Sequence, residues 1–267
     1  MRPPTATRRP SPGFTPSVSL GFSLIEVIVV IAVLSILASM AVPLAAKVID
    51  QSRTEATRKQ MEEIHKVIVG DPALGTAGFA GDMGRLPQGP RFLDQLNTRL
   101  PGQPGQFVNP TLGVRMGWWG PYVNSGFSQG AYLNDAWGTP YDYGNLVTGQ
   151  IRSAGPDRDM TTVADNIVYP PYPVVIAGKL HVSLYLWNGT AYAPYQTADC
   201  PSMTVSFYFS NNGTENSVPM PGPPYTIVSH SGLHAVKATC TAPAATGQAV
   251  VLIPGNNQQA KLDLYLK

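Results

Sequence analysis

Charge is scarce in this sequence, and its scarcity limits what the chain can bind. Asp, Glu, Lys and Arg make up 13% of the 267 residues, about half of the quarter that is typical of globular proteins. The formal charge is only +2, and the first 21 residues contain three arginines and no acid. Such a balance gives no electrostatic grip on a phosphate backbone, so we expect no nucleic-acid partner.

The groups that catalysis needs are missing as well. The chain has four histidines. The three in its last third, His181, His230 and His234, do not stand with Cys or Asp at the spacing of a zinc site. The sequence has no G-x-S-x-G nucleophile turn and no glycine loop of the kind that cradles phosphate. We therefore expect a structural or recognition protein and not an enzyme.

Cysteine is equally rare, with only Cys200 and Cys240 in the whole chain. In an exported protein, an even pair within a low-charge, strand-rich region predicts one disulfide. Closing a loop of about 40 residues would stabilise the fold by roughly 4 kcal/mol in the chain-entropy model. Two buried free thiols are the alternative.

What the sequence does contain is a long apolar run near its N-terminus. Residues 22–42 are apolar except for scattered serines and one charge, Glu26. As a helix this run would be about 32 Å long, enough to span a bilayer. The residues before it are basic and have no apolar core of their own, unlike a secretory signal. Their charge predicts that they stay in the cytoplasm, with the bulk of the protein across the membrane.

The helical pattern continues beyond the apolar run. Pro43 would bend the helix or break its hydrogen-bond ladder locally. Gly70-Asp71-Pro72 is a clear stop signal. Between them, apolar residues recur near one helical face, at Ile49, Ala56, Met61, Ile64 and Ile68. We therefore expect one helix over residues 22–69, with its first part in lipid and its second part covering a soluble domain.

The N-terminal pattern resembles the signal of type IV pilins and of the pseudopilins of type II secretion. The residues that carry this resemblance are Gly21, Phe22, Glu26 and Pro43. It implies that a prepilin peptidase cuts between Gly21 and Phe22 and then methylates the new amine of Phe22. Residues 1–21 would be a leader peptide, and Glu26 and Pro43 would become the fifth and twenty-second mature residues.

Glu26 is the residue of the apolar run that most needs an explanation. A carboxylate in a membrane costs roughly 2.5–3.5 kcal/mol at the centre of a helix and less near its end. The resemblance implies that Glu26 pairs with the amine of Phe22 on a neighbouring subunit as a filament assembles. A simple signal anchor with a stray glutamate is the alternative.

Two stretches in residues 70–169 resemble the head of the major pseudopilin of type II secretion. DAWGTPYDYGN begins at residue 135, and IRSAGPDRDMTTVADNIVY begins at residue 151. They contain a D-x-W-G-x-P-Y hairpin and an S-x-G-x-D loop that ends in Asp and Ile. The matching residues are Asp135, Trp137, Gly138, Pro140, Tyr141, Ser153, Gly155, Asp157, Asp165 and Ile167.

This resemblance implies a Ca²⁺ site in the acidic loop, built from carboxylates and backbone carbonyls. Asp157, Asp159 and Asp165 offer three hard oxygen donors, and Asn166 could add a fourth. Ca²⁺ takes six to eight oxygens and readily draws them from a loop. Arg158 stands where the family usually has a glycine, and it could neutralise the carboxylates. A loop held by Arg–Asp pairs without metal is therefore the alternative.

Residues 170–267 lie outside the resemblance. Alternating apolar residues at 181–187, 203–210 and 261–267 predict strands, and Asn-Asn-Gly-Thr at 211–214 predicts a turn. With YTIVSH, HAVKATC and QAVVLIPG, six short strands favour a β-sandwich closed by the cysteine pair. The low charge and many Tyr, Ser, Thr and Asn suit an adhesive or carbohydrate-facing surface, and equally a structural decoration.

The expected fold is α+β. A leader at 1–21 precedes a helix at 22–69, of which 22–42 cross the membrane. The helix packs on a small antiparallel β head at 70–169, and a β-sandwich-like domain follows at 170–267.

The leading functional expectation is a pilin-like subunit that prepilin peptidase cleaves. It would assemble into a type II secretion pseudopilus or a related type IV filament, with its own kind or with other pilin-like subunits. An inner-membrane assembly platform would be a partner. The head would be periplasmic before assembly, and the filament periplasmic or on the cell surface. The alternative is a minor type IV pilin whose C-terminal β-domain is an adhesive or partner-binding module.

Overall fold

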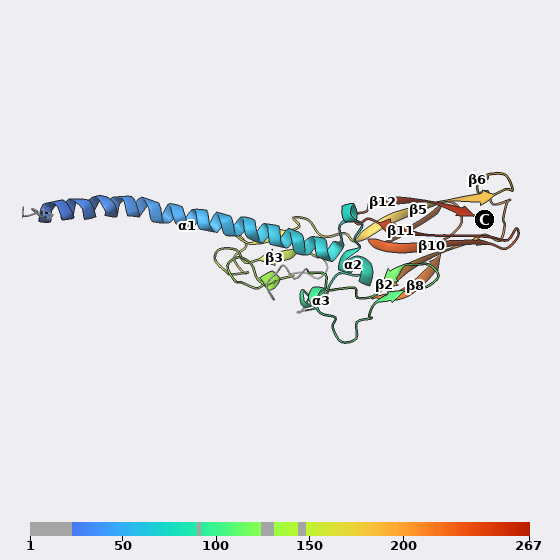
Figure 1. The fold of residues 1–267 in the computed structure, drawn as a ribbon, viewed down its shortest axis with the longest axis horizontal. Coiled ribbons are helices and arrows are strands. Elements are labelled where there is room, and N and C mark those ends of the chain that lie inside the picture. The colour runs from blue at the N-terminus through green and yellow to red at the C-terminus, as the bar shows by residue number, and fades with distance from the viewer. Residues whose placement is uncertain (1–22, 90–91, 124–130, 144–147) are drawn as a thin grey trace, which may run out of the picture. The chain divides into compact units, whose positions relative to one another are not determined.

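The computed structural model describes residues 23–89, 92–123, 131–143 and 148–267. The chain forms two compact units, Met1–Ile49 and Asp50–Lys267. Helix α1 (Leu24–Val69) begins in the first unit and ends in the second. The predicted α+β class is confirmed, since the long helix is followed by mainly antiparallel sheets (Figure 1).

Helix α1 begins and ends where its sequence provides caps. The N–H of Glu26 donates to Ser23 Oγ (3.2 Å), which satisfies one of the free amides of the first turn. Pro43 lies inside the helix, and α1 continues through it. At the C-terminal end, Gly70 adopts a φ of +84° and its N–H donates to the Lys66 carbonyl. Only glycine adopts that conformation readily, so the helix stops there.

The second half of α1 packs on the head through one face. Thr57, Met61, Ile64 and Ile68 are buried, and their spacing of four, three and four residues places them on one stripe. Each fully buried apolar side chain contributes roughly 1.5–3 kcal/mol. The head core that this stripe joins includes Phe79, Met83, Phe92, Leu93, Leu96, Trp137, Tyr141, Tyr143, Ile151 and Ile167.

The head contains only short elements, as its many glycines and prolines predict. One 3₁₀ turn precedes two short helices and the first antiparallel pair, and a second 3₁₀ turn precedes the other antiparallel pair. The elements are η1 (Pro72–Leu74), α2 (Gly78–Met83), α3 (Asp94–Asn97), β1 (Phe107–Val108), β2 (Arg115–Met116), η2 (Ala131–Leu133), β3 (Ile151–Ser153) and β4 (Ile167–Tyr169).

The C-terminal part forms two sheets that face each other across one core (Figure 1). One sheet has the order β11-β10-β7-β8, from Ala245–Ile253, Gly232–Cys240, Thr204–Asn211 and Thr214–Pro219. In the other, β12 (Gln259–Leu266) pairs with β5 (Ala177–Trp187), whose opposite edge holds β6 (Tyr192–Pro194) and β9 (Tyr225–His230). All six predicted strands are present, and β6 and β8 are additional. We call residues 177–267 the β-domain.

Strands β12 and β5 run parallel, whereas every other described strand pair is antiparallel. Alternate residues of β5 point inward, and Leu180, Val182, Leu184 and Leu186 are buried in the core between the sheets. The other residues of β5 form the outer face of the sheet.

The predicted disulfide is confirmed. Cys200 and Cys240 are bonded, with their Cα atoms 6.1 Å apart. The bond joins the segment before β7 to the last residue of β10. It closes a loop of the expected size and fixes one end of the β-domain.

Helix α2 joins the head to the β-domain. The Asp82 carbonyl accepts from Ser210 Oγ (2.7 Å), and the Met83 carbonyl accepts from the N–H of Gly213 (2.9 Å). The backbones approach so closely that a Cβ on Gly84 would stand 2.1 Å from the Ser210 carbonyl oxygen. The head and the β-domain accordingly belong to one compact unit.

Candidate functional site

The first candidate site is the N-terminal part of α1. It is long and apolar enough to cross a membrane, and its large apolar side chains are exposed, with Leu24 at 78% and Met40 at 70%. A continuous apolar surface of this size requires lipid or another protein as its surroundings. This segment therefore has the physical properties expected of a membrane anchor or an assembly helix.

The few polar groups of this segment are arranged in ways that suit lipid. Ser35 Oγ donates to the Ile31 carbonyl and Ser39 Oγ to the Ile36 carbonyl, both at 2.7 Å. Hydroxyls that are satisfied by the preceding helical turn need no water. Glu26 lies in the first turn of the helix, where the helix dipole favours a negative charge. Gly21 and Phe22, the predicted cleavage and methylation residues, lie outside the described residues.

The second candidate site is the hairpin that carries the D-x-W-G-x-P-Y motif. Asp135 is buried and organises the turn, since its Oδ1 accepts from the N–H groups of Trp137 (3.0 Å) and Thr139 (2.9 Å). Its Oδ2 accepts from Ser153 Oγ (2.6 Å). Gly138 adopts a φ of +83° at the tip of the turn. Asp135 thus links the hairpin to the first strand of the next motif.

The hairpin is joined to α1 by hydrogen bonds. The N–H of Ala136 donates to Thr57 Oγ1 (3.2 Å), and Tyr141 Oη donates to Gln60 Oε1 (2.8 Å). Trp137 Nε1 donates to Asp50 Oδ1 (3.3 Å). The hairpin therefore fixes the head to residues 50–60 of the helix, directly after the apolar segment. We call this set of contacts the helix clamp.

The acidic loop is the third candidate site. Asp157 Oδ1 accepts from the N–H of Asp159 (2.8 Å), and Asp159 Oδ1 accepts from the N–H and hydroxyl of Thr161 (2.8 and 2.7 Å). The bonds from Thr161 lower the pKa of Asp159. In the described part of the chain, no ion pair joins Arg158 to a carboxylate. Turn hydrogen bonds, and not Arg–Asp pairs, therefore hold this loop.

Two oxygens of the acidic loop are buried without a partner. They are Asp165 Oδ1 and Asn166 Oδ1, while Asp165 Oδ2 accepts from the N–H of Asp157 (3.2 Å). Within the described ranges, no three His, Cys, Asp or Glu side chains converge as a metal-binding group. Of the predicted ligands, the structure thus leaves Asp165 and Asn166 with an available oxygen and turns Asp159 toward Thr161.

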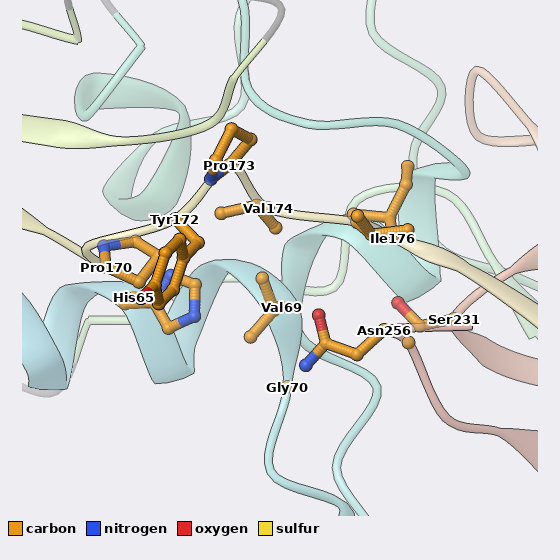
Figure 2. A pocket seen from close by; sticks show the side chains of 12 residues that line it. His65, Val69, Gly70, Pro170, Tyr172, Pro173, Val174, Ile176, Ser231 and Asn256 are labelled. Atoms are coloured by element: carbon orange, nitrogen blue, oxygen red, sulfur yellow. The ribbon is translucent and has the colours of Figure 1, made fainter. Parts of the chain in front are cut away.

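A cavity of about 380 Å³ lies between the end of α1, the segment after β4 and the β-domain. Figure 2 shows His65 and Val69 from α1, Pro173 and Ile176 from the connecting segment, and Ser231 from the β-domain around it. His65 Nδ1 and Ser231 Oγ are buried without a partner. Burial lowers the pKa of His65. A small, mostly apolar group would fit such a site.

A second cavity of similar size has a buried acid in its wall. Asp82 is 1% exposed. It pairs with Arg115 (Nε to Oδ1, 3.0 Å) and accepts from Tyr122 Oη (3.0 Å). Burial raises the pKa of Asp82 to about 6, although Arg115 and Tyr122 oppose the shift. Sequence reasoning missed this network because its members are far apart in the chain and no motif contains them.

Two histidines pack together inside the β-domain. The rings of His230 and His234 are 4.7 Å apart, and His234 is fully buried. His230 Nε2 lies 2.7 Å from the Ser210 carbonyl. Burial lowers the pKa of His234 to about 3 and also lowers that of His230. His234 is therefore a core side chain whose burial favours the neutral form of its ring.

Residues 17–42 match the model of one protein family, the prokaryotic N-terminal methylation motif. The match contains Gly21, Phe22 and Glu26, and it ends just before Pro43. The motif is typical of type IV pilins and pseudopilins, and it implies processing by prepilin peptidase and assembly with other pilins. A search of curated proteins found no match to the chain.

We predict that the helix clamp stabilises the unit measurably. Thr57→Val and Tyr141→Phe each remove one hydrogen-bonding hydroxyl with little change in volume, so each should lower the free energy of unfolding by about 1 kcal/mol. Denaturant titration of the detergent-solubilised chain would measure the loss. Tyr172→Phe is the matched control because Tyr172 is 79% exposed. Losses equal to that of the control would show that the clamp contributes nothing.

The buried His234 predicts a dependence of stability on pH. Its folded pKa of about 3 lies below the ordinary histidine pKa of 6.5, so the unfolded state binds more protons between these values. Wild-type stability should therefore fall as the pH drops below about 6.5, and His234→Gln should lack this part of the loss. The stability gap between wild type and variant should narrow from pH 7 to pH 5. A gap that stays constant or widens, by denaturant titration at both pH values, would contradict the prediction.

Proposed function

We propose that this chain is a structural subunit, not an enzyme, of a type II secretion pseudopilus or a related type IV filament. The observation that carries the proposal is the exposed apolar segment of α1, which has the methylation motif at its start and one carboxylate in its first turn. Prepilin peptidase would cut after Gly21 and methylate Phe22. The filament would then form by packing of the apolar segments.

Glu26 gives this assembly a driving force and a register. In lipid the carboxylate is costly, and the cleavage that creates the Phe22 amine also creates its partner. Pairing Glu26 with that amine on a neighbouring subunit neutralises both charges as the helix leaves the membrane. The pairing can form only at one longitudinal offset between helices, so it also sets the position of each subunit. The inner-membrane assembly platform would act on this step.

The head favours a type II secretion pseudopilus over other type IV filaments. The hairpin and the acidic loop occur in the order found in the major pseudopilin, and Asp135 joins them through Ser153. The helix clamp ties both motifs to residues 50–60 of α1. We place the head in the periplasm, because the basic leader would stay in the cytoplasm.

The β-domain supports a second candidate, a minor type IV pilin with an adhesive module. It has its own apolar core and its own disulfide, so it carries much more structure than the head needs. Deleting the gene in the native organism separates the two candidates. Loss of secreted proteins from the medium would support the pseudopilus, whereas loss of surface attachment with normal secretion would support the adhesive pilin.

The acidic loop would hold Ca²⁺ through Asp165 Oδ1, Asn166 Oδ1 and backbone carbonyls of the same loop. The two unpartnered buried oxygens fit a hard cation. Asp157 would add a second negative charge beside that of Asp165. Asp159 would act as a turn-forming residue beside the site. A bound cation would neutralise these carboxylates and fix the loop after β3.

The assembly role of Glu26 predicts a specific defect. Glu26→Ala should leave leader cleavage intact, because the cut lies five residues away, and should reduce incorporation into filaments at least tenfold. Intact mass would report cleavage and methylation, and the sheared filament fraction would report assembly. Glu55→Ala is the control, since Glu55 is an exposed acid on the same helix. A normal filament yield from Glu26→Ala would count against charge pairing.

The Ca²⁺ proposal predicts a difference between metal and chelator. Asp165→Asn keeps an oxygen that can accept from the N–H of Asp157 but removes the charge that a cation needs. Ca²⁺ should raise the thermal midpoint of the wild type by several degrees and leave that of Asp165→Asn unchanged. Differential scanning calorimetry with Ca²⁺ and with chelator would measure both. Equal wild-type midpoints in the two conditions would mean a metal-free loop.

A further inference from the structure

One end of the outer face of the β5 sheet is aromatic. Because β5 and β12 are parallel and in register, Tyr185 lies beside Tyr265. On the other edge of β5, Tyr192 of β6 pairs with Trp187. We call these four residues the aromatic platform. Figure 1 shows β6 and the end of β12 at the same end of the β-domain, next to the C-terminus.

The four rings of the platform contact one another in series. Tyr185 and Tyr265 stack, with centroids 5.0 Å apart and an interplanar angle of 21°. Tyr192 meets Tyr265 edge-on at 5.2 Å and Trp187 at 5.0 Å. Each contact between rings stabilises the arrangement beyond the effect of burial alone. The platform is therefore held in a fixed shape, and the rings do not need to be ordered when a ligand arrives.

The platform faces solvent. The exposed fractions are 37% for Trp187, 41% for Tyr192 and 52% for Tyr265. These residues do not serve the core of the β-domain, because the inward residues of β5 and β12 already fill it. Aromatic rings that are ordered by one another, exposed and not used by the core are typical of a recognition surface.

The size of the platform excludes a second protein as its natural occupant. Aromatic side chains bury roughly 150–250 Å² each, so the exposed parts of these rings amount to on the order of 300 Å². A stable protein interface buries about 800 Å² on each partner. The rows beyond the platform are polar and would not extend such an interface, since Asp263 pairs with Ser183 and Lys261 with His181. The ligand is therefore narrow.

The chemistry of the surface favours a saccharide chain over a nucleic acid. Flat rings fit the C–H faces of sugar rings, and the neighbouring Asp263, Ser183 and Lys267 side chains can bond to hydroxyls. Lys267 lies over Trp187 (Nζ 5.8 Å from the ring centroid). A polyanion would need several phosphate-neutralising residues around the rings. Beside the platform, Lys261 and Lys267 stand against Asp263, a net of one positive charge. The chain as a whole is nearly neutral.

We propose that the aromatic platform binds a neutral polysaccharide, with successive sugar rings packed against the exposed parts of the Tyr185–Tyr265 and Trp187–Tyr192 pairs. The register of the strands sets the spacing of the two pairs, so the ligand must be extended across the sheet. None of the four platform residues belongs to α1, and the proposal holds for either kind of filament.

The test uses the full chain in detergent with hydroxyethylcellulose, xylan and a chitin oligosaccharide as probes. Affinity electrophoresis and the fluorescence of Trp187 and the other tryptophans would report binding. We expect one of the probes to bind, with an affinity that changes little between low and high salt. Tyr265→Ala should weaken it at least tenfold, while Tyr265→Phe should retain it because stacking needs the ring and not the hydroxyl. Tyr172→Ala is the control, an exposed tyrosine outside the platform.

Four outcomes would overturn the proposal. Binding to none of the three saccharides is the first, and saccharide binding that Tyr265→Ala and Trp187→Ala leave intact is the second. The third is a stronger, steeply salt-dependent binding of oligo-dT, which would assign the platform to nucleic acid. The fourth is self-association of the wild type that Tyr265→Ala abolishes, measured by sedimentation, because the platform would then be a protein interface. Circular dichroism of each variant would show that the β-domain is folded.

Discussion

The structure depends on one helix that meets two kinds of surroundings. The first part of α1 exposes apolar side chains around its whole circumference, and such a surface is stable only in lipid or among similar helices. The second part buries a single stripe and leaves the rest to water. The change occurs near Asp50, where the two units meet along the chain and where the helix clamp begins. The head is attached to the second part of this helix through the helix clamp.

The helix clamp shows how a short motif can fix the position of a long helix against the head. One carboxylate oxygen of Asp135 accepts from its own turn and the other accepts from Ser153. The turn can then present the Ala136 N–H and the Tyr141 hydroxyl to polar partners on α1. Since Thr57 is fully buried, its bond replaces one that water can no longer supply. The motif therefore serves to join the helix and the head, and its position in the sequence gives no direct sign of that.

Local patterns predicted much of this fold, and long-range contacts account for what they missed. The helix stop at Gly70 and six strands follow from glycine content and periodicity, which act within a few residues. The disulfide follows from the count of two cysteines. Strand β8 was missed because it is an exposed edge strand without apolar alternation. The parallel pairing of β12 with β5, the Asp82–Arg115 pair and the aromatic platform join residues that are distant in the chain. The arrangement of the acidic loop was missed for a local reason, because the spacing of its carboxylates does not show that Asp159 bonds to Thr161, two residues further along.

Several contacts connect the β-domain, which carries the platform, to the head and to the second part of α1. A tethered module would let its ligand move freely, but the β-domain is not joined to the head by a single strand of chain. Helix α2 bonds to Ser210 and Gly213, and the segment after β4 bonds to the β-domain through Val175 and Asn256. The helix clamp continues this path to α1. A force on the platform would therefore be distributed over several contacts before it reached residues 50–69 of α1.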